Sequence, residues 1–264
     1  MAKQVKLFIV LAILLGVVSC RTPQNIAYFQ DLKADASITV NAQNADIKLR
    51  EGDKLSIMVS CRDENVAKMF NLMSVTQTIG NSYSQRVSHY TVDNKGTIDF
   101  PVIGKIEVKG LNRTEVLDLI KQKLVSSEMI TDPVVVVEFQ NMYFDVLGEM
   151  ARPGRYTIEK DRMTILEALS MAGDLSIVGQ RCNVKVLRDD ENGNKKVYEF
   201  DMTKGEDLLT SPIYYIQQND VLYVESNNFR KRQSKAAGNT VYNPSFWISV
   251  ASFLSSMYVI FIKD

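Results

Sequence analysis

The residues that could do chemistry in this 264-residue chain are few and scattered. The single histidine, His89, stands in an alternating polar and apolar stretch, and one imidazole without further ligands forms no metal site. Asp189, Asp190 and Glu191 cluster in a Gly- and Asn-containing loop, which favours a solvated turn over a calcium site. G-x-S-x-G and P-loop motifs are absent from the sequence. The sequence therefore predicts no catalytic residue, no metal ligand and no cofactor, and we do not expect an enzyme.

Cys20 is the residue whose surroundings predict a covalent modification. Two lysines and an apolar run over 7–18 give residues 1–19 the layout of a secretory signal peptide, and the run is short for a membrane span. GVVSC then places small residues directly before the cysteine, as in the lipobox of bacterial lipoproteins. Cys20 is thus expected to be lipidated and to become the first mature residue; an ordinary signal peptide that ends near a cysteine is the alternative. Arg21, in place of aspartate, indicates an outer-membrane lipoprotein with the bulk of its chain in the periplasm.

The other two cysteines lie in separate parts of the chain. Cys61 ends the alternating stretch LSIMVSC, and Cys182 begins CNVKV, where it shares a face with Val184 and Val186. Each pattern indicates a core position of its own domain, so we expect two free thiols. A disulfide between them is the alternative in an oxidising compartment.

The chain ends on a long, almost uncharged segment that carries a polar stripe. Residues 244–262 are expected to form a transmembrane or amphipathic helix, because 245–262 would span about 27 Å. Trp247 and Tyr258 near its ends suit the interfaces of a membrane. The serines that fall on one stripe of this helix are Ser245, Ser249, Ser252 and Ser256.

Three interpretations of the stripe remain open. The helix could be a lone anchor, which needs no stripe. The serines could instead allow helices to pack closely through small residues. They could also face a water-filled lumen made by several copies in a ring. The last two interpretations are compatible, since a helix–helix seam can border a lumen.

The elements between the two ends fall into two units. Residues 20–45 are polar and are expected to form a lipidated tether, and residues 46–140 form an α+β unit. Residues 141–226 are mostly strands around one helix and fit a β-grasp fold. A basic linker over 227–243 precedes the terminal helix. The balance of 31 basic and 31 acidic residues gives no global charge that would favour nucleic acid.

Local signals place the elements of the first unit. Asp63 is a potential cap for a helix that carries Val66, Met69, Phe70 and Met73 on one face. The polar stretch 74–86 is expected to be irregular. VSHYTV, a DNKG turn and TIDFPVI are typical of a hairpin, and the next helix is expected to begin at Asn112 or Thr114.

In the second unit Thr164 and Glu167 form a capping-box pattern for a central helix, and Gly173 is expected just after its end.

Residues 46–226 also resemble a known family. GDKLSIMV, TVDNKGTIDFPVIGKIEVKGLNRTEVLDLI and DPVVVVEF are similar to the polysaccharide-export domain of outer-membrane polysaccharide export lipoproteins of the Wza type. FDVLGEMARPGRYTI, TILEALSMAGDL and QQNDVLYV are similar to the SLBB β-grasp domain that follows it in that family. The best-known members carry two such β-grasp repeats, whereas one is found here, so the height of a ring and its number of subunits stay open.

The resemblance implies a function and partners. It predicts an outer-membrane lipoprotein that forms an oligomeric ring, usually an octamer, and exports capsular or extracellular polysaccharide across the periplasm and outer membrane. The ring would dock on an inner-membrane polysaccharide copolymerase of the tyrosine-kinase type. A non-conducting lipoprotein that binds glycan or scaffolds an envelope complex is the alternative.

Overall fold

The structure is a computed structural model that describes residues 26–262, apart from positions 36, 41, 43, 44, 72, 79–81, 88, 129, 191, 192 and 237. The backbone alone is described for 73–78, for 82–87 and for positions 258, 259, 261 and 262. The predicted signal peptide and Cys20 lie outside the described residues.

The first unit is a three-stranded antiparallel sheet with two helices and two hairpins. Its elements are β1 (Lys54–Ser60), α2 (Glu64–Phe70), β2 (Met73–Thr78), β3 (Ser82–Val87), β4 (His89–Thr91), β5 (Thr97–Phe100), β6 (Gly104–Glu107), α3 (Arg113–Ser126) and β7 (Val134–Phe139). The sheet order is β4-β1-β7, and alternate residues Leu55, Ile57 and Val59 of β1 are buried. α3 contacts β7 and α2 contacts β1.

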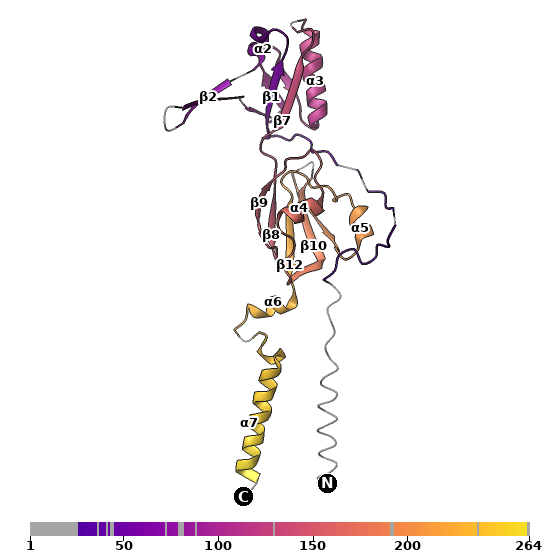
Figure 1. The fold of residues 1–264 in the computed structure, drawn as a ribbon, viewed down its shortest axis with the longest axis vertical. Coiled ribbons are helices and arrows are strands. Elements are labelled where there is room, and N and C mark those ends of the chain that lie inside the picture. Colours follow the sequence, from indigo (N-terminus) through magenta and orange to yellow (C-terminus); the bar gives the residue numbers. More distant parts are fainter. Residues whose placement is uncertain are drawn as a thin grey trace.

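Two predictions about this unit are wrong. The stretch 74–86 is not irregular, because β2 and β3 pair as a separate antiparallel hairpin that projects from the sheet (Figure 1). The strands on either side of the DNKG turn do not pair with each other. β4 pairs with β1, whereas β5 turns back onto β6.

The predicted helix caps of α2 and α3 are present in the structure. Asp63 accepts a hydrogen bond from the backbone N–H of Asn65 at the start of α2. The cap of α3 is Asn112 and not Thr114, because Asn112 and Glu115 form a reciprocal capping box. In α2, Phe70 is buried, but Met69 is exposed and Met73 already belongs to β2, so the predicted apolar face is shorter than expected.

The second unit is a five-stranded mixed sheet with a central helix. Its elements are β8 (Tyr143–Gly148), β9 (Gly154–Thr157), α4 (Ile165–Met171), β10 (Gly179–Asp189), β11 (Lys195–Phe200), α5 (Gly205–Leu209) and β12 (Val221–Ser226). The order is β11-β10-β12-β8-β9, with β12 and β8 parallel and all other neighbours antiparallel. The predicted capping box of Thr164 and Glu167 and a left-handed Gly173 after α4 are both confirmed. The α+β class is thereby confirmed.

The two units share one continuous apolar core and a set of polar contacts at their joint. Buried Gln218 donates to buried Asp53 at 2.6 Å, joining the turn before β12 to the turn before β1. Arg113 pairs with Asp161 at 2.8 Å near the same joint.

The chain leaves the second unit at the end farthest from the first unit (Figure 1). Residues 227–243, called the neck below, contain α6 (Asn228–Gln233) and the 3₁₀ turn η1 (Thr240–Tyr242). The neck leads into α7 (Pro244–Ile262), which confirms the predicted terminal helix and its length.

Candidate functional site

α7 lies apart from both units and exposes apolar side chains on more than one side. Ile248, Phe253 and Leu254 are 66%, 65% and 61% exposed, although the core of each unit is well buried. Contiguous exposed apolar surface of this kind marks a protein or membrane contact. A search of the described residues for a helix that is long and apolar enough to cross a membrane finds none. The predicted transmembrane character of α7 therefore has no support from the structure.

The predicted serine stripe lies along this helix, and its hydroxyl groups bond within the helix. Ser249 Oγ donates to the carbonyl of Ser245 at 2.9 Å, and Ser256 Oγ donates to the carbonyl of Ser252 at 3.0 Å. Back-bonding to the carbonyl four residues earlier satisfies a hydroxyl donor without water. The stripe thus presents small side chains, two of which need no outside acceptor.

Trp247, predicted to lie at a membrane interface, has a second contact that its sequence position does not reveal. Its indole Nε1 donates to the carbonyl of Val241 at 2.8 Å, and its ring packs edge-on against Phe246. The ring is still 58% exposed. Trp247 therefore ties the first turn of α7 to η1 while it keeps an apolar face free. The side chain of Tyr258 lies outside the described residues.

The neck was predicted to be a basic linker, but its cations hold it against the second unit. Lys231 pairs with Glu225 at 2.7 Å. Glu149 accepts from the hydroxyls of Ser226 and Ser176 and from Arg230. Burial raises the pKa of Glu149, but these donors outweigh burial and leave that pKa below its ordinary value. A charged Glu149 thus fastens the start of the neck.

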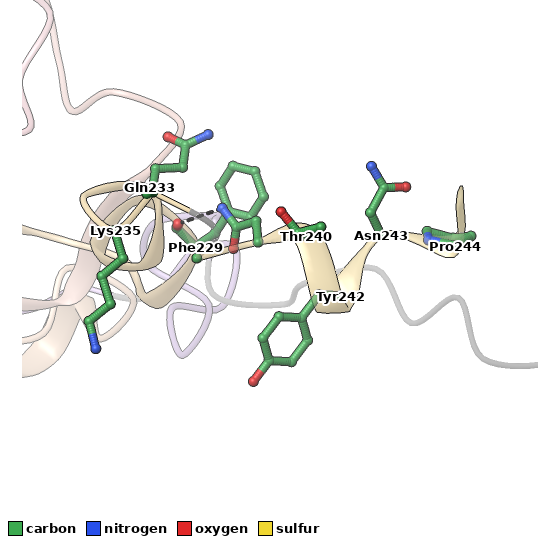
Figure 2. Close-up of a pocket in the computed structure, with 10 residues that line it drawn as sticks. Phe229, Gln233, Lys235, Thr240, Tyr242, Asn243 and Pro244 are labelled. Carbon is green, nitrogen blue, oxygen red and sulfur yellow. Dashed lines mark hydrogen bonds between the residues drawn. The ribbon is translucent and has the colours of Figure 1, made fainter. Parts of the chain in front are cut away.

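Farther along the neck, Arg232 donates to Asn239 and lies over the ring of Tyr242. Asn239 donates to the carbonyl of Phe229 (Figure 2). A shallow cavity of about 460 Å³ lies beside these residues. Its lining combines Phe229, Tyr242 and amide groups with one cation, Lys235. This set contains no nucleophile beside a base and no carboxylate.

The other residues singled out for chemistry are dispersed. His89 is exposed on β4, an edge strand. Asp190 accepts from Asn194 and closes the turn between β10 and β11, and Asp189 pairs with Lys195; Glu191 lies outside the described residues. Within the part of the chain that the structure describes, no group of three or more His, Cys, Asp or Glu residues could hold a metal ion.

Cys61 and Cys182 are both free thiols, as predicted. Cys61 is partly buried beside the core, but Cys182 is exposed, so its predicted core position is wrong. The pairing of β10 with β12 shifts register between Gly179 and Val184, and this irregularity reverses the alternation on which the prediction relied. Burial, followed by the charge of Asp201, raises the pKa of the Cys182 thiol.

Sequence reasoning missed a docked segment inside the predicted tether. Residues 28–32, called the strap below, lie against the second unit beside α5 (Figure 1). Phe29 and Gln30 donate their backbone N–H groups to the carbonyls of Met202 and Thr203, at 3.2 and 2.7 Å. The signal in the sequence is the aromatic pair Tyr28-Phe29 within an otherwise polar stretch.

Comparisons with known proteins bear on both units. Residues 41–140 match the family model of polysaccharide biosynthesis/export proteins, and residues 143–200 match the SLBB domain. The EPS I polysaccharide export outer membrane protein EpsA of Ralstonia nicotianae is 29% identical over 177 residues, which cover 59% of this chain and 45% of that protein. The protein of the same name from Ralstonia solanacearum is 30% identical over 179 residues, which cover 60% of this chain and 46% of that protein.

The chain spans less than half the length of these two relatives. The matched domains nevertheless follow one another in the order that the sequence resemblance predicted. The chain thus combines a polysaccharide biosynthesis/export domain with an SLBB domain, and over these domains it is similar to polysaccharide export outer membrane proteins.

Proposed function

We propose that the protein is an outer-membrane lipoprotein that assembles into a ring and exports extracellular or capsular polysaccharide. The domain pair and the export function in the names of both relatives support the transport role and the outer-membrane address. In this proposal residues 1–19 are removed, Cys20 carries the lipid, and units 46–140 and 141–226 form the periplasmic part. The partners are further copies of this chain, the polysaccharide and an inner-membrane copolymerase of the tyrosine-kinase type.

The observation that carries the ring is the exposed apolar surface of α7. One helix cannot enclose water, so a conduit needs several copies of α7 side by side. In such a barrel one face of each helix meets lipid, and another face meets its neighbours. We assign Leu254 to the lipid side and the serine stripe to the seam between helices, because two of the serine hydroxyls already bond within their own helix.

Conductance across a planar bilayer tests the proposal directly. The purified full-length protein should open large, water-filled channels, and a chain truncated after Asn243 should not conduct. Complementation of an export-deficient strain adds the second arm, in which the truncated chain should fail. Normal export by the truncated chain would refute α7 as part of the conduit. An oligomer that never conducts would favour the alternative, a glycan-binding or scaffolding lipoprotein.

A further inference from the structure

The strap is held to the second unit by both side-chain and backbone contacts. Tyr28 Oη donates to Asp174 at 2.5 Å, and Asp31 accepts from the N–H groups of Gly205 and Glu206 at 2.6 and 3.1 Å. These contacts join residues more than 140 positions apart in the sequence. Burial, followed by the hydrogen bond to Asp174, raises the pKa of Tyr28, so its hydroxyl stays a donor at neutral pH.

Two further features indicate that the strap belongs in this place. Phe29 has φ +54°, in the left-handed region that a bulky residue adopts only where its surroundings hold it. A Cβ added to Gly205 would lie 2.6 Å from Leu32 Cδ1, 2.7 Å from Leu32 Cγ and 3.0 Å from Phe29 Cδ1. The three atoms nearest to that position all belong to the strap, so the glycine leaves room for it.

We propose that the strap is an intramolecular docking segment that fixes the lipid anchor to the second unit. The proposal rests on the proposed lipidation of Cys20. Cys20 precedes Tyr28 by eight positions, so even a fully extended chain holds the lipid within about 29 Å of the docked tyrosine. The strap runs beside α5 toward the end of the unit from which the neck leaves (Figure 1). In the proposed arrangement, lipid and α7 therefore reach the membrane from the same end, and the length of the chain between Cys20 and Tyr28 limits how far the second unit can stand from it.

Hydrogen exchange of the full mature protein in detergent tests the docking. The amides of Phe29 and Gln30 should exchange slowly in the wild type. Asp31→Ala, which removes both carboxylate contacts, and Gly205→Ala, which intrudes on Leu32, should each speed this exchange about tenfold or more. Asp207→Ala, on the exposed side of the same helix, should leave it within about twofold. Exchange at the rate of an open chain in the wild type would overturn the proposal.

A cross-link tests the same contact on the membrane of living cells. In a Cys61→Ser, Cys182→Ser background, Leu32→Cys with Gly205→Cys should form a disulfide, because the sulfur at 32 would stand where Leu32 Cγ now lies. The matched pair Leu32→Cys with Asp207→Cys should remain reduced. Equal cross-linking of both pairs, or of neither, would overturn docking. Both readouts are independent of export and of acylation, so their failure would leave the proposed function standing, and a failed conductance test would leave the strap standing.

Discussion

At the scale of single residues, the most demanding polar contact is a buried ion pair in the second unit. Arg188 on β10 donates from Nε and Nη2 to the two carboxylate oxygens of Asp220, at 2.9 and 2.7 Å. Asp220 is fully buried and also accepts from the N–H of Gln217. Burial raises the pKa of Asp220, and Arg188 opposes that effect. A charge in such a place is tolerated only with its partner.

Asp220→Asn should therefore destabilise the protein by about 3–5 kcal/mol, because it leaves the Arg188 guanidinium buried without a counter-charge. The double change Asp220→Asn, Arg188→Met should cost less than the single change, since it removes the stranded cation as well. Urea unfolding of the three variants measures the difference. A single change that costs under about 1 kcal/mol would show that water reaches the site.

The capping box of α4 gives a prediction with a pH dependence. A hydrogen bond from Lys160, followed by one from the N–H of Thr164, holds the pKa of Glu167 below its ordinary value. A depressed folded-state pKa stabilises the fold above the unfolded pKa, and this stability is lost as the pH falls through the folded pKa. Glu167→Gln should thus lower the unfolding midpoint at pH 7, and the gap to wild type should close at acidic pH. A gap that stays constant between pH 7 and pH 3 would mean that the charge of Glu167 adds nothing.

At the scale of elements, local signals in the sequence were reliable where the partner lies within a few residues. Asp63, Asn112 and Thr164 cap their helices because a short side chain bonds an N–H two or three positions ahead. Apolar alternation likewise placed β1. The export and β-grasp units could be anticipated because they rest on many such signals, each consistent with the others.

Most of the failures have the opposite property, which is a partner far away in the chain. The β2–β3 hairpin is the exception: its strands are close in the sequence, but they are mostly polar, so the sequence predicts them only weakly. β4 pairs with β1, about 35 positions earlier, although a good turn sequence follows it. The strap forms hydrogen bonds with Met202 and Asp174. A local pattern in a polar stretch cannot predict partners so far away in the chain. In the candidate site, the spacing of the serines was enough to predict the stripe on α7. The hydrogen bond from Trp247 to Val241 could not be predicted, because it depends on the fold of the neck.

α7 gives the prediction that belongs to this scale. Leu254→Arg, on the proposed lipid side, should impair membrane insertion, because a cation at the middle of a membrane helix costs about 2.5–3.5 kcal/mol. Ser252→Arg is the matched change on the stripe. If the stripe faces lumen water, this variant should insert normally and alter ion selectivity. If the stripe is a dry seam, as its internal hydrogen bonds favour, both variants should be equally damaged. Flotation of membranes and single-channel recording distinguish these outcomes, and normal insertion of Leu254→Arg would exclude a lipid-facing role for that side.

At the scale of the whole molecule, the joint between the units decides whether the first unit follows the second as one body. The core is continuous across the joint, and the buried contact from Gln218 to Asp53 lies within it. We therefore expect the two units to unfold in one transition. A further polar contact across the joint, from Arg162 to Asp46, involves an Arg162 side chain that is 61% exposed, so it should contribute little.

Gln218→Leu tests the joint alone, because it removes the amide group that donates to Asp53. The buried carboxyl of Asp53 then lacks this hydrogen bond. At pH 7 this substitution should lower the stability by about 1–3 kcal/mol and shift the single transition as a whole, whereas Arg162→Ala should cost no more than about 1 kcal/mol.

Burial holds the pKa of Asp53 above its ordinary value, so stability from this group is present below the unfolded pKa and is lost as the pH rises through the folded pKa. The cost of Gln218→Leu should accordingly be smaller at pH 4 than at pH 7. Urea unfolding followed by a signal from each unit measures both effects. Two separate transitions in the wild type would show that the units are independent.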